Sequence, residues 1–404
     1  MRAVIHIGAP KTGTTSLQRS CVMNEAVLLA NGVLFAKAGR VFESRTEQRH
    51  VGLRFAVKVP ASPPDGMMER LGLTTADARS RYAEMFADQL DTEIGEAEPE
   101  TVLLSDEALF LLGDRSTVEQ LSQFLRERFS NILVVCFLRH PVDYVRGLCS
   151  QRIKSGDLTR IDLENDPYFA NGLYQQRLDY WSAAFGRDEF KVRVADEDII
   201  SQFQAVTGIT GLNDAEPQDL NKSLNAFGAE CFLQLNQRYS KDTRPPIIRR
   251  AFEQSMTGKP FSLTATDEKW VWDRFKSEKE GIVRHHLDRD EDVRVVQETW
   301  VSSPVQTETS LIDQDIVRET ADIISFLSDQ IEETKKHHLK TAGRMRKTNL
   351  QLRTRVRKQQ KKMEVLNAQV DSLSGEIETR IKEIQELQEE IERLSRPLIK
   401  RLWS

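Results

Sequence analysis

Three features are scarce in this chain of 404 residues, and each scarcity excludes a class of protein. Its apolar runs are all shorter than the roughly 18 residues that a membrane-spanning helix needs. The cysteines are Cys21, Cys136, Cys149 and Cys231, and their spacing fits neither a metal site nor a disulfide framework. The first apolar segment begins at Val4, so we expect no secretion signal. We therefore expect a protein of the reducing cytoplasm.

Net charge is also small, at −5, but it hides two parts of opposite sign. Residues 335–404 contain 18 Lys and Arg against 9 Asp and Glu, a net charge of +9. The remaining 39 basic and 53 acidic residues give residues 1–334 a net charge of −14. Any surface that binds polyanions is therefore expected on the C-terminal part, and no nucleic-acid partner is expected.

The most informative segment lies at the N-terminus. An apolar run at residues 4–7 leads into Gly8-Ala9-Pro10-Lys11-Thr12-Gly13-Thr14-Thr15-Ser16, and helix-forming residues follow. This pattern predicts a strand, a turn and a helix N-terminus, where backbone N–H groups, the helix dipole and Lys11 converge on an anion. The turn is not a Walker A loop, because its lysine lies two residues before Gly13 instead of directly after it. The alternative is an ordinary turn rich in glycine and threonine.

Strand and helix patterns alternate through the first half of the chain. Apolar segments at 4–7, 33–36, 101–104, 132–138 and 190–194 are separated by helical patterns at 15–31, 75–94, 116–129, 142–155 and 174–185. This alternation predicts an α/β fold, a P-loop-like three-layer domain with a central parallel sheet over residues 1–300. Within it, residues 221–300 are expected to be mostly helical. A connector and a last body helix are expected at 301–334.

Residues 335–396 carry a heptad pattern. With Val356 at position a, every a residue from 356 to 391 is apolar, and the d positions from 352 to 394 are leucines apart from Gln359 and Arg380. β-Branched residues at a with leucine at d favour a two-stranded parallel coiled coil, and hence a homodimer. However, residues 335–362 contain 12 Lys and Arg and no acid, whereas 364–392 contain 9 acids and 2 bases, which favours an antiparallel pair.

We prefer the parallel arrangement from the core residues. The basic stretch also fits a solvated helix surface that binds nothing. Residues 397–404 mix cations with apolar groups, so they are either a peripheral contact with an anionic inner-membrane surface or a frayed terminus.

The segment P-K-T-G-T-T-S after a first strand resembles the 5′-phosphosulfate loop of sulfotransferases. The resemblance covers about residues 1–240 and is closest to bacterial enzymes of the carbohydrate type. It implies 3′-phosphoadenosine-5′-phosphosulfate (PAPS) as sulfuryl donor, no metal, and a glycan or other hydroxyl group as acceptor. The loop residues that it implies as ligands of the donor are Pro10, Lys11, Thr12, Gly13, Thr14, Thr15 and Ser16.

A second resemblance concerns FLRHPVDYVRGLCSQR at residues 137–152. In sulfotransferases an Arg-x-Pro after a strand, with a serine eight residues beyond the arginine, binds the 3′-phosphate. Arg139 and Pro141 match, but the serine position holds Gly147, and Ser150 one helical turn later is the substitute. The alternative is that Arg139 only pairs with an acid at the strand end. A later Asn-x-Ser-Leu segment adds Asn221 and Ser223 as nucleotide contacts or, equally well, as helix caps.

Two residues compete for the role of general base. Glu107 follows a strand in Ser-Asp-Glu, where open α/β sheets place reactive groups, and resembles the Ser-x-Glu of bacterial sulfotransferases. His50, in a loop after the second strand, is the rival. The preferred interpretation is a PAPS-dependent sulfotransferase that uses Glu107. The alternatives are a catalytically degenerate adaptor that acts through its coil, and a P-loop nucleotide kinase with Asp106 as its magnesium ligand.

Overall fold

The computed structural model describes residues 1–42, 45–56, 68–69, 71–170, 172–213, 224–239, 243, 260–301 and 314–402. It divides into two compact units, Met1–Ser325 and Phe326–Ser404, and each is considered by itself. Residues 302–313 of the expected connector and the candidate ligands Asn221 and Ser223 lie outside the described residues.

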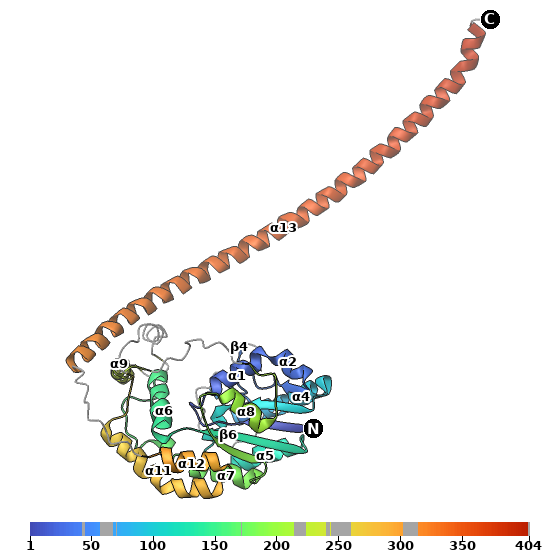
Figure 1. Cartoon of the computed structure of the whole chain (residues 1–404). Helices are drawn as coiled ribbons and strands as arrows, with labels where there is room; N and C mark the ends of the chain where they lie inside the picture. The colour runs from blue at the N-terminus through green and yellow to red at the C-terminus, as the bar shows by residue number, and fades with distance from the viewer. Residues whose placement is uncertain are drawn as a thin grey trace. The chain divides into compact units, whose positions relative to one another are not determined.

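The first unit contains a five-stranded parallel sheet in the order β2-β5-β1-β6-β7 (Figure 1). The α/β fold class with a parallel sheet is therefore confirmed. The strands are β1 (Arg2–His6), β2 (Val33–Phe35), β5 (Thr101–Ser105), β6 (Asn131–Leu138) and β7 (Phe190–Val194). The strands β2 and β5 lie on one side of β1, and the later strands β6 and β7 lie on the other side. The carboxyl end of β1 is thus the point of the sheet where ligands of open α/β folds bind.

Helices cover both faces of this sheet, which gives the three layers expected. On one face, a cluster formed around Leu17, Ile199 and Phe203 packs α1 (Thr14–Met23) and α8 (Ile199–Thr207) against the sheet. The larger cluster on the other face includes Phe86, Leu121 and Trp181. The described part of this unit also contains the helices α2 (Glu25–Ala30), α4 (Ala76–Ala97), α5 (Arg115–Arg126), α6 (Pro141–Ser155), α7 (Gln175–Phe185), α9 (Ala226–Arg238), α11 (Ala265–His285) and α12 (Asp290–Arg294).

Two local features differ from the sequence prediction. The helix expected over 15–31 is two helices, because the Asn24 side chain donates to the Ser20 carbonyl at 2.9 Å and the chain leaves helical geometry there. A two-stranded antiparallel ribbon, β3 (Val41–Phe42) with β4 (Arg45–Thr46), was not predicted.

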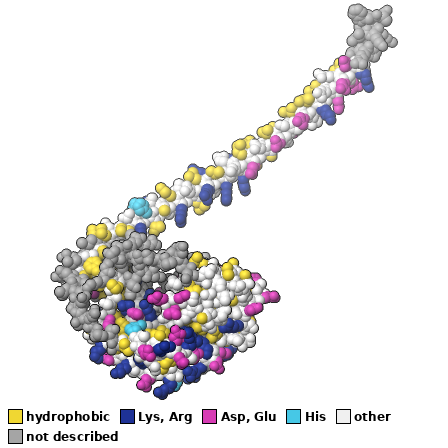
Figure 2. Space-filling model, viewed as in Figure 1, with side chains coloured by type: hydrophobic (Ala, Val, Ile, Leu, Met, Phe, Trp, Pro, Cys, Tyr) yellow, Lys and Arg dark blue, Asp and Glu magenta, His cyan; other side chains and the backbone are white. Residues whose placement is uncertain are grey.

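A single long helix, α13 (Gln314–Leu402), forms the second unit and the end of the first. It continues through residue 335, where the sequence predicts a separate coiled coil, because no proline interrupts it before Pro397. Figure 2 shows Lys and Arg side chains gathered along its earlier part and Asp and Glu along its later part. None of the described helices is long and apolar enough to cross a membrane.

Candidate functional site

The loop between β1 and α1 has the geometry of an anion cradle. Its first residues continue along β6, since the amides of Ile7 and Ala9 donate to the carbonyls of Val135 and Phe137 at 3.0 Å each. The Thr12 hydroxyl then closes the turn by donating to the Ala9 carbonyl at 2.8 Å. The turn ends in left-handed backbone at Lys11 (φ 74°) and Gly13 (φ 81°). For Lys11 this conformation is uncommon, and such strain is found preferentially at binding sites.

Backbone N–H groups are left open at this turn. In the part of the chain that the structure describes, the amides of Gly13, Thr14 and Thr15 donate to no protein acceptor, whereas Ser16 and Leu17 both bond to the Gly13 carbonyl. The first turn of α1 also carries no acidic residue. Open amides at the positive end of a helix dipole stabilise a bound anion, so the loop is suited to a phosphate or sulfate group.

Arg139 lies directly beside the loop. Its Nη1 donates to the Lys11 carbonyl at 2.9 Å, which brings together two segments 128 residues apart in sequence. The Arg139 carbonyl in turn accepts a hydrogen bond from the buried Tyr174 hydroxyl at 2.7 Å. An ion pair with Asp143 also forms, with Nε 3.8 Å from Oδ2, but both side chains are partly exposed and such pairs contribute little. The pairing with an acid that was the alternative for Arg139 is therefore present, and the binding of a 3′-phosphate by Arg139 stays a prediction.

Gly147 has a steric role next to Lys11. A Cβ atom at position 147 of α6 would lie 2.8 Å from Lys11 Cγ and 3.2 Å from Lys11 Cβ. The lysine side chain therefore passes over α6 at the one position of that turn where no side chain projects. A glycine at position 147 thus makes room for the loop lysine.

Ser150, the substitute expected for that serine, has a different environment. It is buried, and its hydroxyl accepts a hydrogen bond from the Leu224 amide at 3.5 Å. Leu224 directly follows the segment that contains Asn221 and Ser223, which the structure does not describe. A role for Ser150 in nucleotide binding stays a prediction.

Glu107 lies next to the loop because of the strand register. β5 pairs with β1 so that Ser105 faces His6, and the loop and Glu107 both follow at the carboxyl ends of these strands. Glu107 Oε2 accepts from Gln18 Nε2 at 2.8 Å, and Oε1 accepts from Arg49 Nη1 at 3.2 Å. The side chain is 21% exposed, so its carboxylate is both oriented and reachable from solvent.

Asp106, by contrast, is fully buried. Its Oδ1 accepts from Arg49 Nη1 at 2.9 Å and from the Ala108 amide at 3.2 Å. Burial raises the pKa of Asp106 to about 6, although the neighbouring Arg49 opposes this shift. Asp106 therefore holds Arg49 and caps the turn after β5, while Glu107 presents the accessible carboxylate.

His50, the rival base, is completely buried and both of its ring nitrogens are engaged. Nδ1 accepts from the Ser105 amide at 3.0 Å, so Nε2 carries the proton and donates to the Ala36 carbonyl at 2.8 Å. Burial, helped by the nearby Arg40, lowers the pKa of His50 to about 3. These contacts leave the ring no lone pair for an acceptor proton, so the geometry favours Glu107 over His50.

Two further residues at the site were not identified from the sequence. His6, at the end of β1, lies under the loop: its Nδ1 is 2.9 Å from Ser105 Oγ, and its Nε2 has no hydrogen-bond partner among the described residues. A Cβ on Gly8 would lie 2.8 Å from that Nε2, so only glycine fits above the ring. Burial lowers the pKa of His6 to about 4. The available signal was a polar residue at the end of an otherwise apolar strand.

Gln18 is the second of these residues. From α1 it donates to both Ser105 Oγ at 3.2 Å and Glu107 Oε2 at 2.8 Å. It connects the helix that begins at the anion loop with the carboxylate at the end of β5. Its sequence signal is weak, because a glutamine in a helix is usually a solvent-exposed residue.

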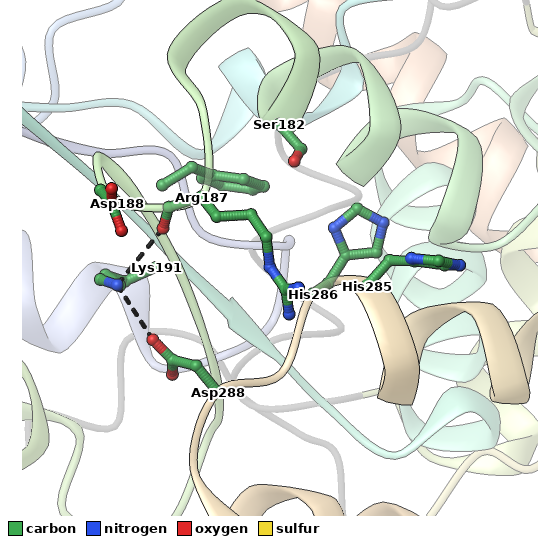
Figure 3. A pocket seen from close by; sticks show the side chains of 8 residues that line it. Ser182, Arg187, Asp188, Lys191, His285, His286 and Asp288 are labelled. Atoms are coloured by element: carbon green, nitrogen blue, oxygen red, sulfur yellow. Dashed lines mark hydrogen bonds and ion pairs between the residues drawn. The ribbon is translucent and has the colours of Figure 1, made fainter.

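A pocket of about 200 Å³ lies elsewhere, at the amino end of β7 (Figure 3). There Lys191 donates to the Asp288 carboxylate at 3.0 Å and to the Arg187 carbonyl at 3.3 Å. Because the sheet is parallel, this pocket opens at the end of the sheet opposite to the anion loop. It is not part of the loop site.

Comparison with known proteins gives one distant structural likeness. No protein-family model matches the chain, and no curated protein matches it. A crystal structure of a sulfotransferase from Alicyclobacillus acidocaldarius aligns over 71% of this chain and 97% of its own, with 16% sequence identity and a TM-score of 0.38. A likeness this distant carries no argument about the site or the reaction.

Proposed function

We propose that this chain is a sulfotransferase that transfers a sulfuryl group from PAPS to a hydroxyl group of a carbohydrate or glycan. The observation that carries the proposal is the hydrogen bond between Arg139 and the Lys11 carbonyl. It joins the two segments whose sequences resemble the two halves of a sulfotransferase donor site. A donor that carries phosphate groups at the 3′ and 5′ positions of one ribose needs both segments at one site, and this hydrogen bond supports that arrangement.

The residues of the loop fit the 5′-phosphosulfate end of such a donor. The open amides of Gly13, Thr14 and Thr15 donate to anionic oxygens, and Lys11 supplies a positive charge where the leaving phosphate develops negative charge. For the 3′-phosphate, Arg139 supplies the cation. PAPS contributes an activated sulfuryl group on a phosphate leaving group, and no metal ion is needed for its transfer.

Glu107 acts on the acceptor side. Two of its roughly four lone-pair sites are used by Gln18 and Arg49, so the carboxylate still has sites to accept the proton of an acceptor hydroxyl. The proton of the acceptor hydroxyl moves to the Glu107 carboxylate while the new O–S bond forms and the S–O bond to the 5′-phosphate breaks. Gln18 and Arg49 fix the carboxylate, and Gln18 couples its position to the helix that starts at the donor loop.

The direct test is an assay for sulfuryl transfer. PAPS is incubated with the protein and a set of mono- and oligosaccharides, and the formation of 3′-phosphoadenosine-5′-phosphate and of sulfated product is followed. Glu107→Gln keeps the shape of the side chain and removes its basicity, so we expect turnover to fall by about 10²- to 10⁴-fold while donor binding is retained. His50→Gln tests the rival base.

The control and the contrary outcomes separate the competing functions. Gly113→Ala, at a glycine with open space around it, should leave turnover unchanged. Donor binding without product for any acceptor would favour the adaptor interpretation. Magnesium-dependent hydrolysis or transfer from ATP, with no response to PAPS, would favour the nucleotide kinase.

A further inference from the structure

We propose that α13 pairs with α13 of a second copy of this chain as an antiparallel two-stranded coiled coil, centred between residues 364 and 365. In the single chain the apolar seam of this helix is open from Leu352 to Ile391. Its apolar a and d residues are 51% exposed at Leu352 and up to 66% exposed at Ile391. The open residues of the seam are Leu352, Val356, Met363, Leu366, Val370, Leu373, Ile377, Ile384, Leu387 and Ile391.

An apolar stripe of this regularity on a long helix needs a partner helix with the same repeat. Burial of apolar surface contributes about 25 cal/mol per Å², and a helix that is polar on its other faces gains this only by pairing along the seam. β-Branched residues at a with leucine at d favour two strands. A second copy supplies a matching repeat.

Charge complementarity identifies that second copy and its direction. Residues 335–362 carry 12 positive charges and no negative ones, while 364–392 carry 9 negative and 2 positive, a net charge of −7. In Figure 2 the two signs occupy successive lengths of the same helix. A parallel pair would place the basic block beside the partner's basic block and the acidic block beside the partner's acidic block. An antiparallel pair places the basic block of one chain beside the acidic block of the other.

The heptad register permits this alignment. In an antiparallel coil each layer joins an a residue of one helix to a d residue of the other. When Met363 faces Leu366 of the partner, the neighbouring layers are Val356 with Leu373 and Leu352 with Ile377. In the same register, residues 335–362 lie opposite residues 367–394, so the charge blocks and the apolar seam are satisfied together.

Arg380 separates the two orientations. It occupies a d position of the seam and forms an ion pair with Glu383 of its own helix at 3.1 Å. In a parallel coil the two Arg380 side chains would meet in one layer, where like charges are costly. In the antiparallel register Arg380 faces Asn349, a polar residue at an a position. This reverses the preference for a parallel pair that the apolar core residues alone suggest.

Single-cysteine variants of the full chain test the proposal. The native cysteines Cys21, Cys136, Cys149 and Cys231 are all buried in the first unit, so they compete little for cross-linking. We expect Leu352→Cys and Ile377→Cys to form a disulfide when the two variants are mixed and oxidised. Neither should cross-link to itself, because copies of the same position would lie about 37 Å apart along the coil, at about 1.5 Å per residue.

The controls make each outcome decisive. Lys361→Cys lies off the seam, and its mixture with Ile377→Cys should not cross-link. Self-cross-linking of Leu352→Cys alone would show a parallel pair and overturn the proposed orientation. A chain that remains monomeric at about 50 μM in sedimentation equilibrium would overturn the pairing itself.

Salt provides a second readout of direction. Attraction between opposite charge blocks is screened by salt, so the dissociation constant of an antiparallel dimer should rise by about tenfold or more between 0.05 and 0.5 M NaCl. In a parallel dimer salt would screen repulsion, and the dissociation constant would fall. A fall in the dissociation constant therefore contradicts the antiparallel arrangement.

Discussion

The two units of this chain use leucine in opposite ways. In the first unit Leu178 of α7 is 0% exposed within a core that one chain completes by itself. In the long helix Leu373 is 58% exposed, although its heptad position is that of a core residue. The same side chain therefore contributes to folding in one unit and, in our proposal, to association in the other. The first unit should be stable at any concentration, whereas the pairing of the helix should depend on concentration.

A matched pair of leucine truncations gives the largest effect. Leu178→Ala removes buried methyl groups and leaves a cavity, so we expect the free energy of unfolding to fall by about 2–5 kcal/mol. Leu373→Ala should change the unfolding of the first unit by less than about 0.5 kcal/mol. Urea denaturation followed by tryptophan fluorescence, at a concentration below dimerisation, measures both. A similar loss of unfolding free energy in both variants would contradict the conclusion that Leu373 does not contribute to the fold of the first unit.

Acid should destabilise the first unit through its buried histidines. The pKa values of His6 and His50 are lowered to about 4 and about 3, so unfolding binds a proton at each as the pH falls below about 6.5. Asp106 acts in the opposite sense, because its pKa is raised to about 6 and the folded state binds its proton first. For these three groups together, the unfolded state binds about one proton more than the folded state between pH 6 and pH 4.

The expected loss of stability from these three groups is therefore about 3 kcal/mol from pH 6.5 to pH 4. Urea midpoints at pH 7.5, 6.0 and 5.0 measure it. His6→Asn removes one of the two protons and should flatten the slope. Stability that stays constant or rises on acidification would show that these histidines are not buried as described.

A matched pair of glycine substitutions tests the packing between α6 and the donor loop. Gly147→Ala should displace the Lys11 side chain and weaken the binding of 3′-phosphoadenosine-5′-phosphate by about tenfold, or about 1.4 kcal/mol. Gly95→Ala, also within a helix but with nothing within 4 Å of its Cβ, should leave binding unchanged. Both replacements improve helix propensity by about 1 kcal/mol, so a loss of binding by Gly147→Ala alone reports on Lys11.

Much of the fold could be predicted from the sequence because strand and helix periods are local. The five parallel strands and the anion loop after the first of them follow from patterns within a few residues. The break at Asn24 depends on one side-chain hydrogen bond to the backbone, which a smooth helical pattern conceals. The ribbon β3–β4 is only two residues per strand, too short for periodicity to indicate.

Less of the candidate site could be predicted from the sequence, because the contacts within the site join segments that are distant in the chain. Arg139 and Lys11 were expected at one site from resemblance, and the structure places them in contact. Gln18 and His6 were missed, since their partners Ser105 and Glu107 are about 90 to 100 residues away in the chain. The steric role of Gly147 depends on where the Lys11 side chain lies, and no sequence pattern carries that information.

The most direct test of the central claim is a calorimetric titration of the full chain with 3′-phosphoadenosine-5′-phosphate. Since Lys11 and Arg139 are joined at one site, we expect saturable binding that Lys11→Ala and Arg139→Ala each weaken by about 10- to 100-fold, with Gly95→Ala as the unchanged control. Absence of binding heat, or an affinity that neither substitution alters, would contradict the assignment of this loop and arginine as one donor site.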